Sequence, residues 1–234
     1  MKILAHGDSW FSYPKILLTG GSVIDHLSDR LELPIKNMAH AGDGTETMLG
    51  LRKREELICN LPDYDVLLFS GGGNDIAGDQ FILWVEDNKG TGIDAAINRL
   101  ALRHKLDSIE DNYRDLIQIR DETNPNCLLV THGYDFPIPS DQGVCGLGPW
   151  LKPGLVHCGW TDPIDQFEIV KWVMQEFDAR LTSIEAEQKR LGKRHVHVRT
   201  QGTLGASDWA NEIHANRQGL DKLAAKFEIA LAAY

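Results

Sequence analysis

The stretch Lys2-Ile3-Leu4-Ala5-His6-Gly7-Asp8-Ser9-Trp10 is the starting point for interpreting this chain. Its apolar residues stop abruptly at Gly7-Asp8, which is typical of a buried strand followed by a turn. The Ser9 hydroxyl would then lie at the carboxyl end of the strand, where ligands bind in open α/β sheets. On its own the tripeptide Gly-Asp-Ser is weak evidence for catalysis, because Asp and Ser after a strand are more often turn and N-cap residues.

Working outward from this strand, the sequence predicts five strand-helix units. The predicted strands cover residues 2–6, 35–39, 64–70, 127–131 and 195–199. The predicted helices cover residues 22–31, 45–59, 94–123 in two pieces, 164–191 and 217–232. The sequence does not decide whether residues 79–92 form a helix or an irregular wall. Helical connections of this length allow right-handed crossovers between parallel strands. We therefore expect a doubly wound α/β fold, with one domain over residues 1–234.

The segment 136–163 interrupts this pattern. It is rich in proline and contains Trp150 and Trp160. An irregular segment of this length is more than a connector, and its aromatic residues argue against disorder. We expect a loop insertion that forms an ordered lid or pocket wall.

Composition excludes some classes of partner and leaves others open. The 234 residues carry a net charge of −10, with 24 basic and 34 acidic residues and no basic cluster, which argues against nucleic acid and anionic membranes as partners. No apolar run approaches the ~20 residues that span a bilayer, and no export signal is visible, so we expect a cytoplasmic protein. The sequence does not indicate the oligomeric state.

The four cysteines, Cys59, Cys127, Cys145 and Cys158, lack metal-ligand spacing. Free thiols in a reducing compartment are the simpler interpretation. A Cys145–Cys158 bridge inside the 136–163 segment remains an alternative.

Candidate polar groups follow each predicted strand and should meet at one edge of the sheet. They are Ser9, Gly42, Asn74, the pair His132 and Asp135, and His214. A serine nucleophile needs a base within hydrogen-bond reach and donors aimed at the developing oxyanion. Ser9, the His214 imidazole, the backbone N–H groups of Ser9 and Gly42, and the Asn74 amide would meet these needs. His132 and Asp135 are equally compatible with a structural and a substrate-facing role.

On these residues the sequence resembles the SGNH or GDSL hydrolases, a family of esterases, lipases and carbohydrate deacetylases. The motifs, in the family's order over nearly the whole chain, are Gly7-Asp8-Ser9, Gly42, Gly72-Gly73-Asn74-Asp75 and Asn211-Glu212-Ile213-His214. The resemblance implies Ser9 as nucleophile, His214 as base and an oxyanion hole from Ser9, Gly42 and Asn74. It also implies a three-layer, flavodoxin-like sheet of order 2-1-3-4-5, no cofactor or metal, and a small-molecule or carbohydrate ester as substrate.

Two departures from the family pattern concern Trp10 and Asn211. Trp10 stands where the family has leucine, which affects packing rather than chemistry. Asn211 occupies the position of the family's acid, three residues before His214. An asparagine can accept the imidazole N–H and fix the tautomer, but it supplies no negative charge. Asp208, six residues before His214, is the alternative acid.

Two other functions remain open at this point. A metal-dependent phosphoesterase would use ligands among His6, Asp8, Asn74, Asp75, His132 and His214, although the Asp-x-His and Asn-His motifs usual in those enzymes are absent. A non-catalytic carbohydrate- or acyl-binding module on the same fold is favoured only by Asn211. The identity of the ester substrate is not indicated.

Overall fold

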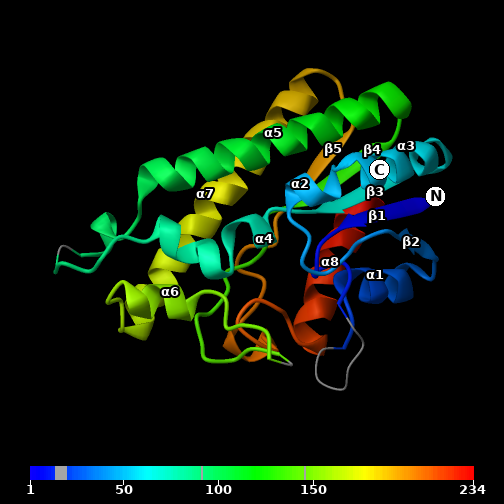
Figure 1. Ribbon diagram of the computed structural model, residues 1–234. Helices are drawn as coiled ribbons and strands as arrows, with labels where there is room; N and C mark the ends of the chain where they lie inside the picture. The colour runs from blue at the N-terminus through cyan, green and yellow to red at the C-terminus, as the bar shows by residue number, and fades with distance from the viewer. Residues whose placement is uncertain (14–19, 91, 145) are drawn as a thin grey trace.

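The computed structural model describes residues 1–13, 20–90, 92–144 and 146–234 (Figure 1). Five parallel strands form one sheet in the order β2-β1-β3-β4-β5. Their bounds are β1 Ile3–Gly7, β2 Ile35–Asn37, β3 Val66–Ser70, β4 Leu128–His132 and β5 His195–Val198. This topology confirms the predicted fold class and strand order. β1, β3 and β4 are buried throughout, because helices cover both faces of the sheet.

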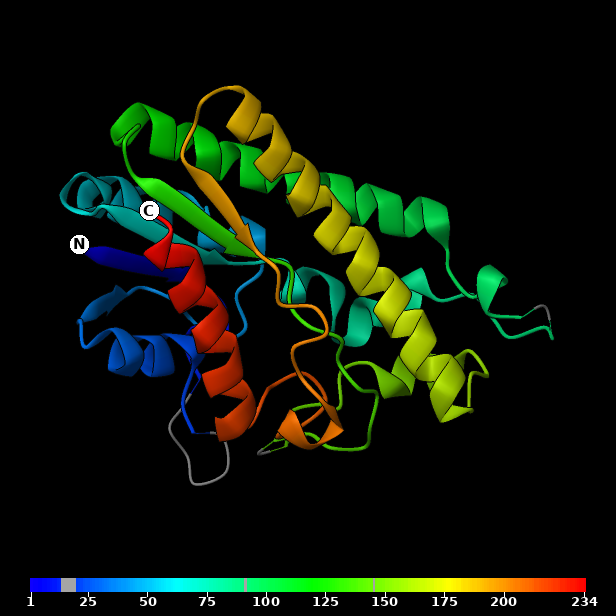
Figure 2. The same ribbon diagram turned by 180° about the vertical axis from the view of Figure 1, so that it is seen from behind.

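The helices form two layers around the sheet. On one face lie α1 (Val23–Leu31) and α8 (Arg217–Ala232), and on the other lie α5 (Arg99–Thr123) and α7 (Pro163–Arg190), as Figures 1 and 2 show. The shorter α-helices are α2 (Thr45–Met48), α3 (Leu51–Asn60), α4 (Gly73–Ile76) and α6 (Lys152–His157), and the 3-10 helices are Leu61–Asp63, Asp79–Trp84, Ile93–Ala95 and Ala206–Asp208. α5 and α7 extend beyond the carboxyl ends of the strands, and α4 and α6 lie beside that extension.

Side-chain caps begin the helices where the sequence predicts them. The Ser22 hydroxyl accepts the Asp25 N–H, and the Asp25 carboxylate accepts the Ser22 N–H, which completes a capping box at α1. The side chain of Asp162 caps α7 ahead of a proline at the first helical position, and that of Asn216 caps α8. These caps explain why the boundaries of the three helices agree with prediction to within one residue.

One helix prediction is wrong in detail, and another is refined. The helix predicted at 45–59 is two helices, because the backbone of Gly50 is extended, with φ −63° and ψ 155°, and starts α3 in a new direction. The 94–123 region is in two pieces, as predicted: a short 3-10 helix, Ile93–Ala95, and the long helix α5, Arg99–Thr123. Asn98 caps α5 and separates the two.

Two segments that lie outside the predicted strands and helices are ordered. Within 79–92, the 3-10 helix Asp79–Trp84 buries Phe81 and Trp84. The 136–163 segment contains α6, and it buries Leu155 and Trp160 completely or nearly so. The segment is therefore ordered, as predicted, but it is partly helical rather than irregular throughout. Of its described residues, only Pro137, Leu151, Leu155, Cys158 and Trp160 are buried.

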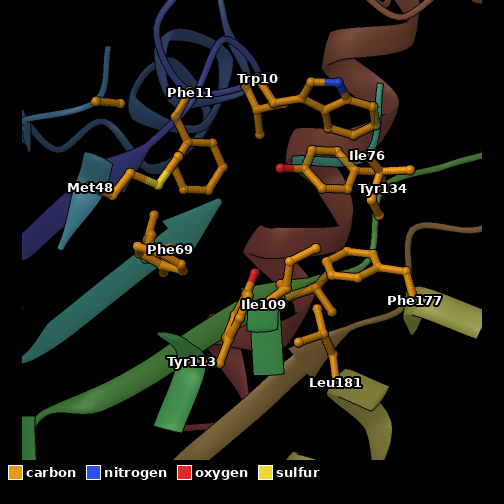
Figure 3. Packing of buried hydrophobic residues seen from close by; sticks show 14 of the residues in the cluster. Trp10, Phe11, Met48, Phe69, Ile76, Ile109, Tyr113, Tyr134, Phe177 and Leu181 are labelled. Atoms are coloured by element: carbon orange, nitrogen blue, oxygen red, sulfur yellow. The ribbon is translucent and has the colours of Figure 1, made fainter. Parts of the chain in front are cut away.

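An aromatic cluster lies where the strands end (Figure 3). The Tyr134 ring lies between Trp10, whose ring centroid is 5.0 Å away, and Phe177, at 5.9 Å. Phe69 packs edge-on against Tyr113 at 5.2 Å. This cluster is continuous with the core of the sheet and forms a rigid base for the residues that follow the strands.

The described residues include three free cysteines, Cys59, Cys127 and Cys158. Cys145, the other half of the bridge considered from sequence, lies outside the described residues. Among the helices in the described ranges, none is both long and apolar enough to cross a membrane.

Candidate active site

Ser9 lies just beyond the end of β1 and is 8% exposed. The Asp8 N–H donates to the Ser70 carbonyl (3.1 Å), which continues the pairing of β1 with β3 past the last residue of the strand. The backbones approach closely here: a Cβ on Gly7 would lie 2.5 Å from the Ser70 carbonyl oxygen. Glycine at position 7 is thus required by the sheet itself.

His214 and Asn211 form a hydrogen-bonded chain that ends on Ser9. The Nε2 atom of His214 lies 2.8 Å from the Ser9 hydroxyl oxygen, and its Nδ1 atom lies 3.0 Å from Asn211 Oδ1. Both residues come from the segment between β5 and α8, which the fold brings to the end of β1. The distances are those of a nucleophile, a base and a group that orients the base.

The backbone around Asn211 fixes the orientation of its amide. Its Oδ1 atom also accepts the N–H groups of Ile213 (3.1 Å) and His214 (3.0 Å), so oxygen rather than nitrogen faces the imidazole. An amide oxygen only accepts hydrogen bonds, which assigns the proton of the ring to Nδ1. Nε2 is then free to accept the Ser9 hydroxyl proton, as a base must.

Two aromatic rings flank His214. The Tyr13 ring centroid lies 4.1 Å away at a tilt of 31°, and the Trp150 ring lies edge-on at 5.5 Å. Burial lowers the pKa of His214 to about 4. The imidazole is therefore neutral at pH 7 and able to take a proton.

Asp208 is engaged away from the imidazole. Its Oδ2 atom accepts from the Lys222 ammonium (2.7 Å) and from the Gly205 N–H (2.7 Å). The hydrogen bond from Lys222 lowers the pKa of Asp208 below its ordinary value. The geometry thus places Asn211, and not Asp208, beside the base.

The two other expected oxyanion donors follow β2 and β3: Gly42 lies in a turn and Asn74 in the short helix α4. Asn74 is the second residue of α4, and its Nδ2 atom donates one hydrogen bond to the Asp43 carbonyl (2.9 Å). The amide carries a second proton, which remains for a ligand. Gly42 is exposed with φ +87°, and no atom lies within 4 Å of the position of a Cβ there. The space above its backbone is open.

A hollow of about 480 Å³ opens beside Ser9, and the Asn74 side chain lies on its wall. Apolar side chains form most of its lining: Trp10, Ile76, Ala77, Phe81, Pro137, Leu151, Met174 and Ile213. A smaller hollow of about 220 Å³, between Tyr13, Leu220 and the His214 ring, also reaches Ser9. Ser9 therefore borders both hollows.

A buried network beneath Ser9 was missed by sequence reasoning. Asp8 accepts hydrogen bonds from the Tyr134 hydroxyl, the Ser70 hydroxyl (2.8 Å) and the Trp10 N–H (3.0 Å). The Tyr134 hydroxyl in turn accepts the Gly73 N–H (3.1 Å). Burial raises the pKa of Asp8 to about 6. The network ties the end of β1 to the start of α4, and nothing in the sequence signals a contact that spans 126 positions.

His132 and Asp135 have structural roles. His132 is completely buried and stacks on Trp10 at 5.4 Å, and burial lowers its pKa to about 3. The Asp135 carboxylate accepts the N–H groups of Gly202 and Leu204, both at 2.6 Å, and so holds the loop after β5.

The side chains considered as metal ligands also have other partners. His6 Nε2 lies 2.9 Å from the Met48 carbonyl oxygen, and the Asp75 carboxylate accepts the N–H and hydroxyl of Thr45. Across residues 1–13, 20–90, 92–144 and 146–234, no three His, Cys, Asp or Glu side chains form a group that could hold a metal ion.

A parallel sheet of this order is the architecture of GDSL and SGNH lipases and esterases, and the chain has that fold. A scan against protein-family models and a search of curated proteins found no match. Solved structures do match over almost the full length.

Three of them illustrate the likeness. A lipase from a goat rumen metagenome is 14% identical, with a TM-score of 0.65 and coverage of 98% of this chain and 97% of the lipase. A member of the lipolytic protein G-D-S-L family from Veillonella parvula is 15% identical, with a TM-score of 0.57 and 100% of both chains covered. A carbohydrate acetylesterase from Sinorhizobium meliloti is 12% identical, with a TM-score of 0.56 and coverage of 99% and 98%. At these identities the likeness establishes the fold.

Proposed function

We propose that this protein is a serine hydrolase that cleaves carboxylic esters, with Ser9 as nucleophile. The observation that carries the proposal is the unbroken chain of hydrogen bonds from Ser9 through His214 to Asn211. The structural neighbours named as lipases and esterases support the same class of reaction.

In this mechanism the Ser9 hydroxyl oxygen attacks the ester carbonyl while His214 Nε2 takes its proton. The carbonyl oxygen becomes an oxyanion, which the N–H groups of Ser9 and Gly42 and the Asn74 amide stabilise. Collapse of this intermediate expels the alcohol, which receives the proton from His214, and leaves an acyl group on Ser9. Water, deprotonated by the same imidazole, then releases the acid and restores the serine.

Asn211 orients the imidazole but does not stabilise its cationic form as a carboxylate would. Burial holds the pKa of His214 near 4, and the neutral amide of Asn211 adds no charge that would raise it. We expect a slower enzyme than one with aspartate at this position, since neutralising the acid in a serine protease costs about 10⁴ in kcat.

The test is hydrolysis of a chromogenic short-chain ester by the wild type and by Ser9→Ala, each with and without a chelator. We expect turnover in the wild type that the chelator does not change, and none in the folded variant. Chelator-sensitive hydrolysis of a phosphate ester would favour a metal-dependent phosphoesterase instead. Saturable binding of a carbohydrate or acyl ligand without turnover would favour a binding module.

A further inference from the structure

Glu212 lies between Asn211 and His214, is completely buried and takes no part in the mechanism above. Its carboxylate accepts four backbone N–H groups. They belong to Ser140 (3.0 Å), Trp150, Leu151 (2.7 Å) and Lys152 (2.8 Å). A carboxylate has about four acceptor sites, so this one is fully used.

All of these donors belong to the 136–163 segment. The Glu212 N–H also donates to that segment, to the Gln142 carbonyl at 3.2 Å. One buried side chain next to the base thus holds two separate stretches of the segment, around residue 140 and residues 150–152. Without it, the buried Leu151 N–H and the three partly buried N–H groups would lose their acceptor, which is costly.

The stretches held by Glu212 form part of the wall of the larger hollow. Pro137 and Leu151 line it, and Trp150 lies edge-on to His214. Ile76 and Phe81, from outside this segment, also line the hollow. The width of the hollow therefore depends on the position that Glu212 gives to the segment.

The lining of the hollow indicates what it accepts. Its wall is mostly hydrocarbon and begins at Ser9, so it suits the hydrocarbon chain of an acyl group attached to that serine. Each methylene that enters such a wall should raise kcat/KM by about fourfold until the hollow is full.

We propose that Glu212 is a specificity-determining residue that fixes the 136–163 segment as the wall of an acyl pocket, and that the substrates are esters of apolar acyl chains of several carbons rather than acetyl esters. This inference rests on the proposed function, because it assumes that Ser9 receives the acyl group. Glu212 acts through the wall and does not touch the reacting atoms, so it is a positioning residue.

The test compares p-nitrophenyl acetate, butyrate, hexanoate and octanoate as substrates of the wild type and of Glu212→Gln. The variant keeps the size of the side chain but replaces one oxygen with an NH₂ group that cannot accept. For the wild type we expect kcat/KM to rise from acetate to hexanoate. For the variant we expect a loss of at least ~10-fold on hexanoate, mainly as a higher KM, and of less than about threefold on acetate.

Glu185→Gln is the matched control. Glu185 is 7% exposed and also accepts a backbone N–H, from His197 at 2.8 Å, but it lines neither hollow. The Glu185→Gln variant should be less stable, but the dependence of its kcat/KM on the length of the acyl chain should not change. If Glu212→Gln does not fold, Ser140→Pro removes one of the four donors and should change the profile in the same direction by a smaller factor.

Binding separates this inference from the proposed function. The Ser9→Ala variant should bind octanoate more tightly than acetate in calorimetry, and adding Glu212→Gln should remove the difference. A wild type without esterase activity but with this preference would overturn the proposed function and support the pocket. Preference for acetate, or equal losses on all four esters in Glu212→Gln, would overturn the inference.

Discussion

At the scale of single residues, the sequence identifies the groups that meet at the strand ends but not what holds them. Ser9 and His214 could be placed because each follows a strand, and parallel strands end at one edge. The roles of Glu212 and Tyr134 could not be predicted, because the hydrogen-bond partners of their side-chain oxygens are at least 60 positions away in the sequence. A lone Glu or Tyr also forms no sequence motif.

The choice between Asn211 and Asp208 leads to a prediction about pH. Asn211→Asp would add a negative charge beside the Nδ1 proton and raise the pKa of His214 from about 4. The base works in its neutral form, so the acid limb of the kcat/KM profile should move to higher pH, and the plateau should rise by ~10-fold or more. Profiles of both proteins on one ester measure the shift.

Asp208→Asn is the comparison for that experiment. It breaks the ion pair with Lys222 and should lower the melting temperature while leaving the midpoint of the pH profile unchanged. A large loss of kcat in Asp208→Asn, together with no effect of Asn211→Ala, would show that we have assigned the wrong residue.

Asn74→Ala tests the oxyanion hole. Deleting one donor typically lowers kcat by 10²–10³, and we expect at least ~10² here with little change in melting temperature. Asn112→Ala is the control. It removes a comparable hydrogen bond from a side-chain amide, to the Thr45 hydroxyl, at a residue that does not line the pocket. Similar losses of activity in the two variants would indicate that Asn74 only supports the fold.

At the scale of elements, the spacing of apolar residues located every long helix and every strand. The errors concern short segments, whose structure that spacing does not determine. The break at Gly50 is a local extension of the backbone that the apolar pattern does not show. The helix α6 has six residues, which is too short for a clear period. The 3-10 helix Asp79–Trp84 has no period of its own, and packing of Phe81 and Trp84 orders it.

The 136–163 segment carries a prediction at this scale. Trp160 is 2% exposed and Trp150 is half-buried against His214. Trp160→Ala should therefore cost about 3–5 kcal/mol of unfolding free energy, as is usual for a buried large-to-small change. Trp150→Ala should cost less stability but more activity. Urea denaturation and ester hydrolysis of both variants check this, and equal stability losses would contradict it.

At the scale of the whole molecule, protonation of buried groups couples stability to pH. Burial lowers the pKa of four histidines, His6, His132, His195 and His214. Burial raises the pKa of three carboxyl groups, Asp8 (to about 6), Asp75 and Glu212. The two sets act on stability with opposite signs.

Below pH 6.5 the unfolded chain binds protons at these histidines that the folded chain does not, so they make stability rise with pH. The carboxyl groups with raised pKa values make stability fall as the pH rises, chiefly between pH 4 and 6. From pH 6 to 7 the histidines dominate, and we expect the unfolding free energy to increase by on the order of 1–2 kcal/mol and then level off. Urea titrations at pH 6, 7 and 8 measure this, and a decrease over that range would refute it.

The most direct test of the central claim is the intact mass of the folded protein after reaction with a fluorophosphonate, followed by peptide mapping. We expect one adduct, on Ser9, that is absent from Ser9→Ala and forms much more slowly in His214→Ala. No adduct on the folded wild type, or an adduct on a different serine, would contradict it.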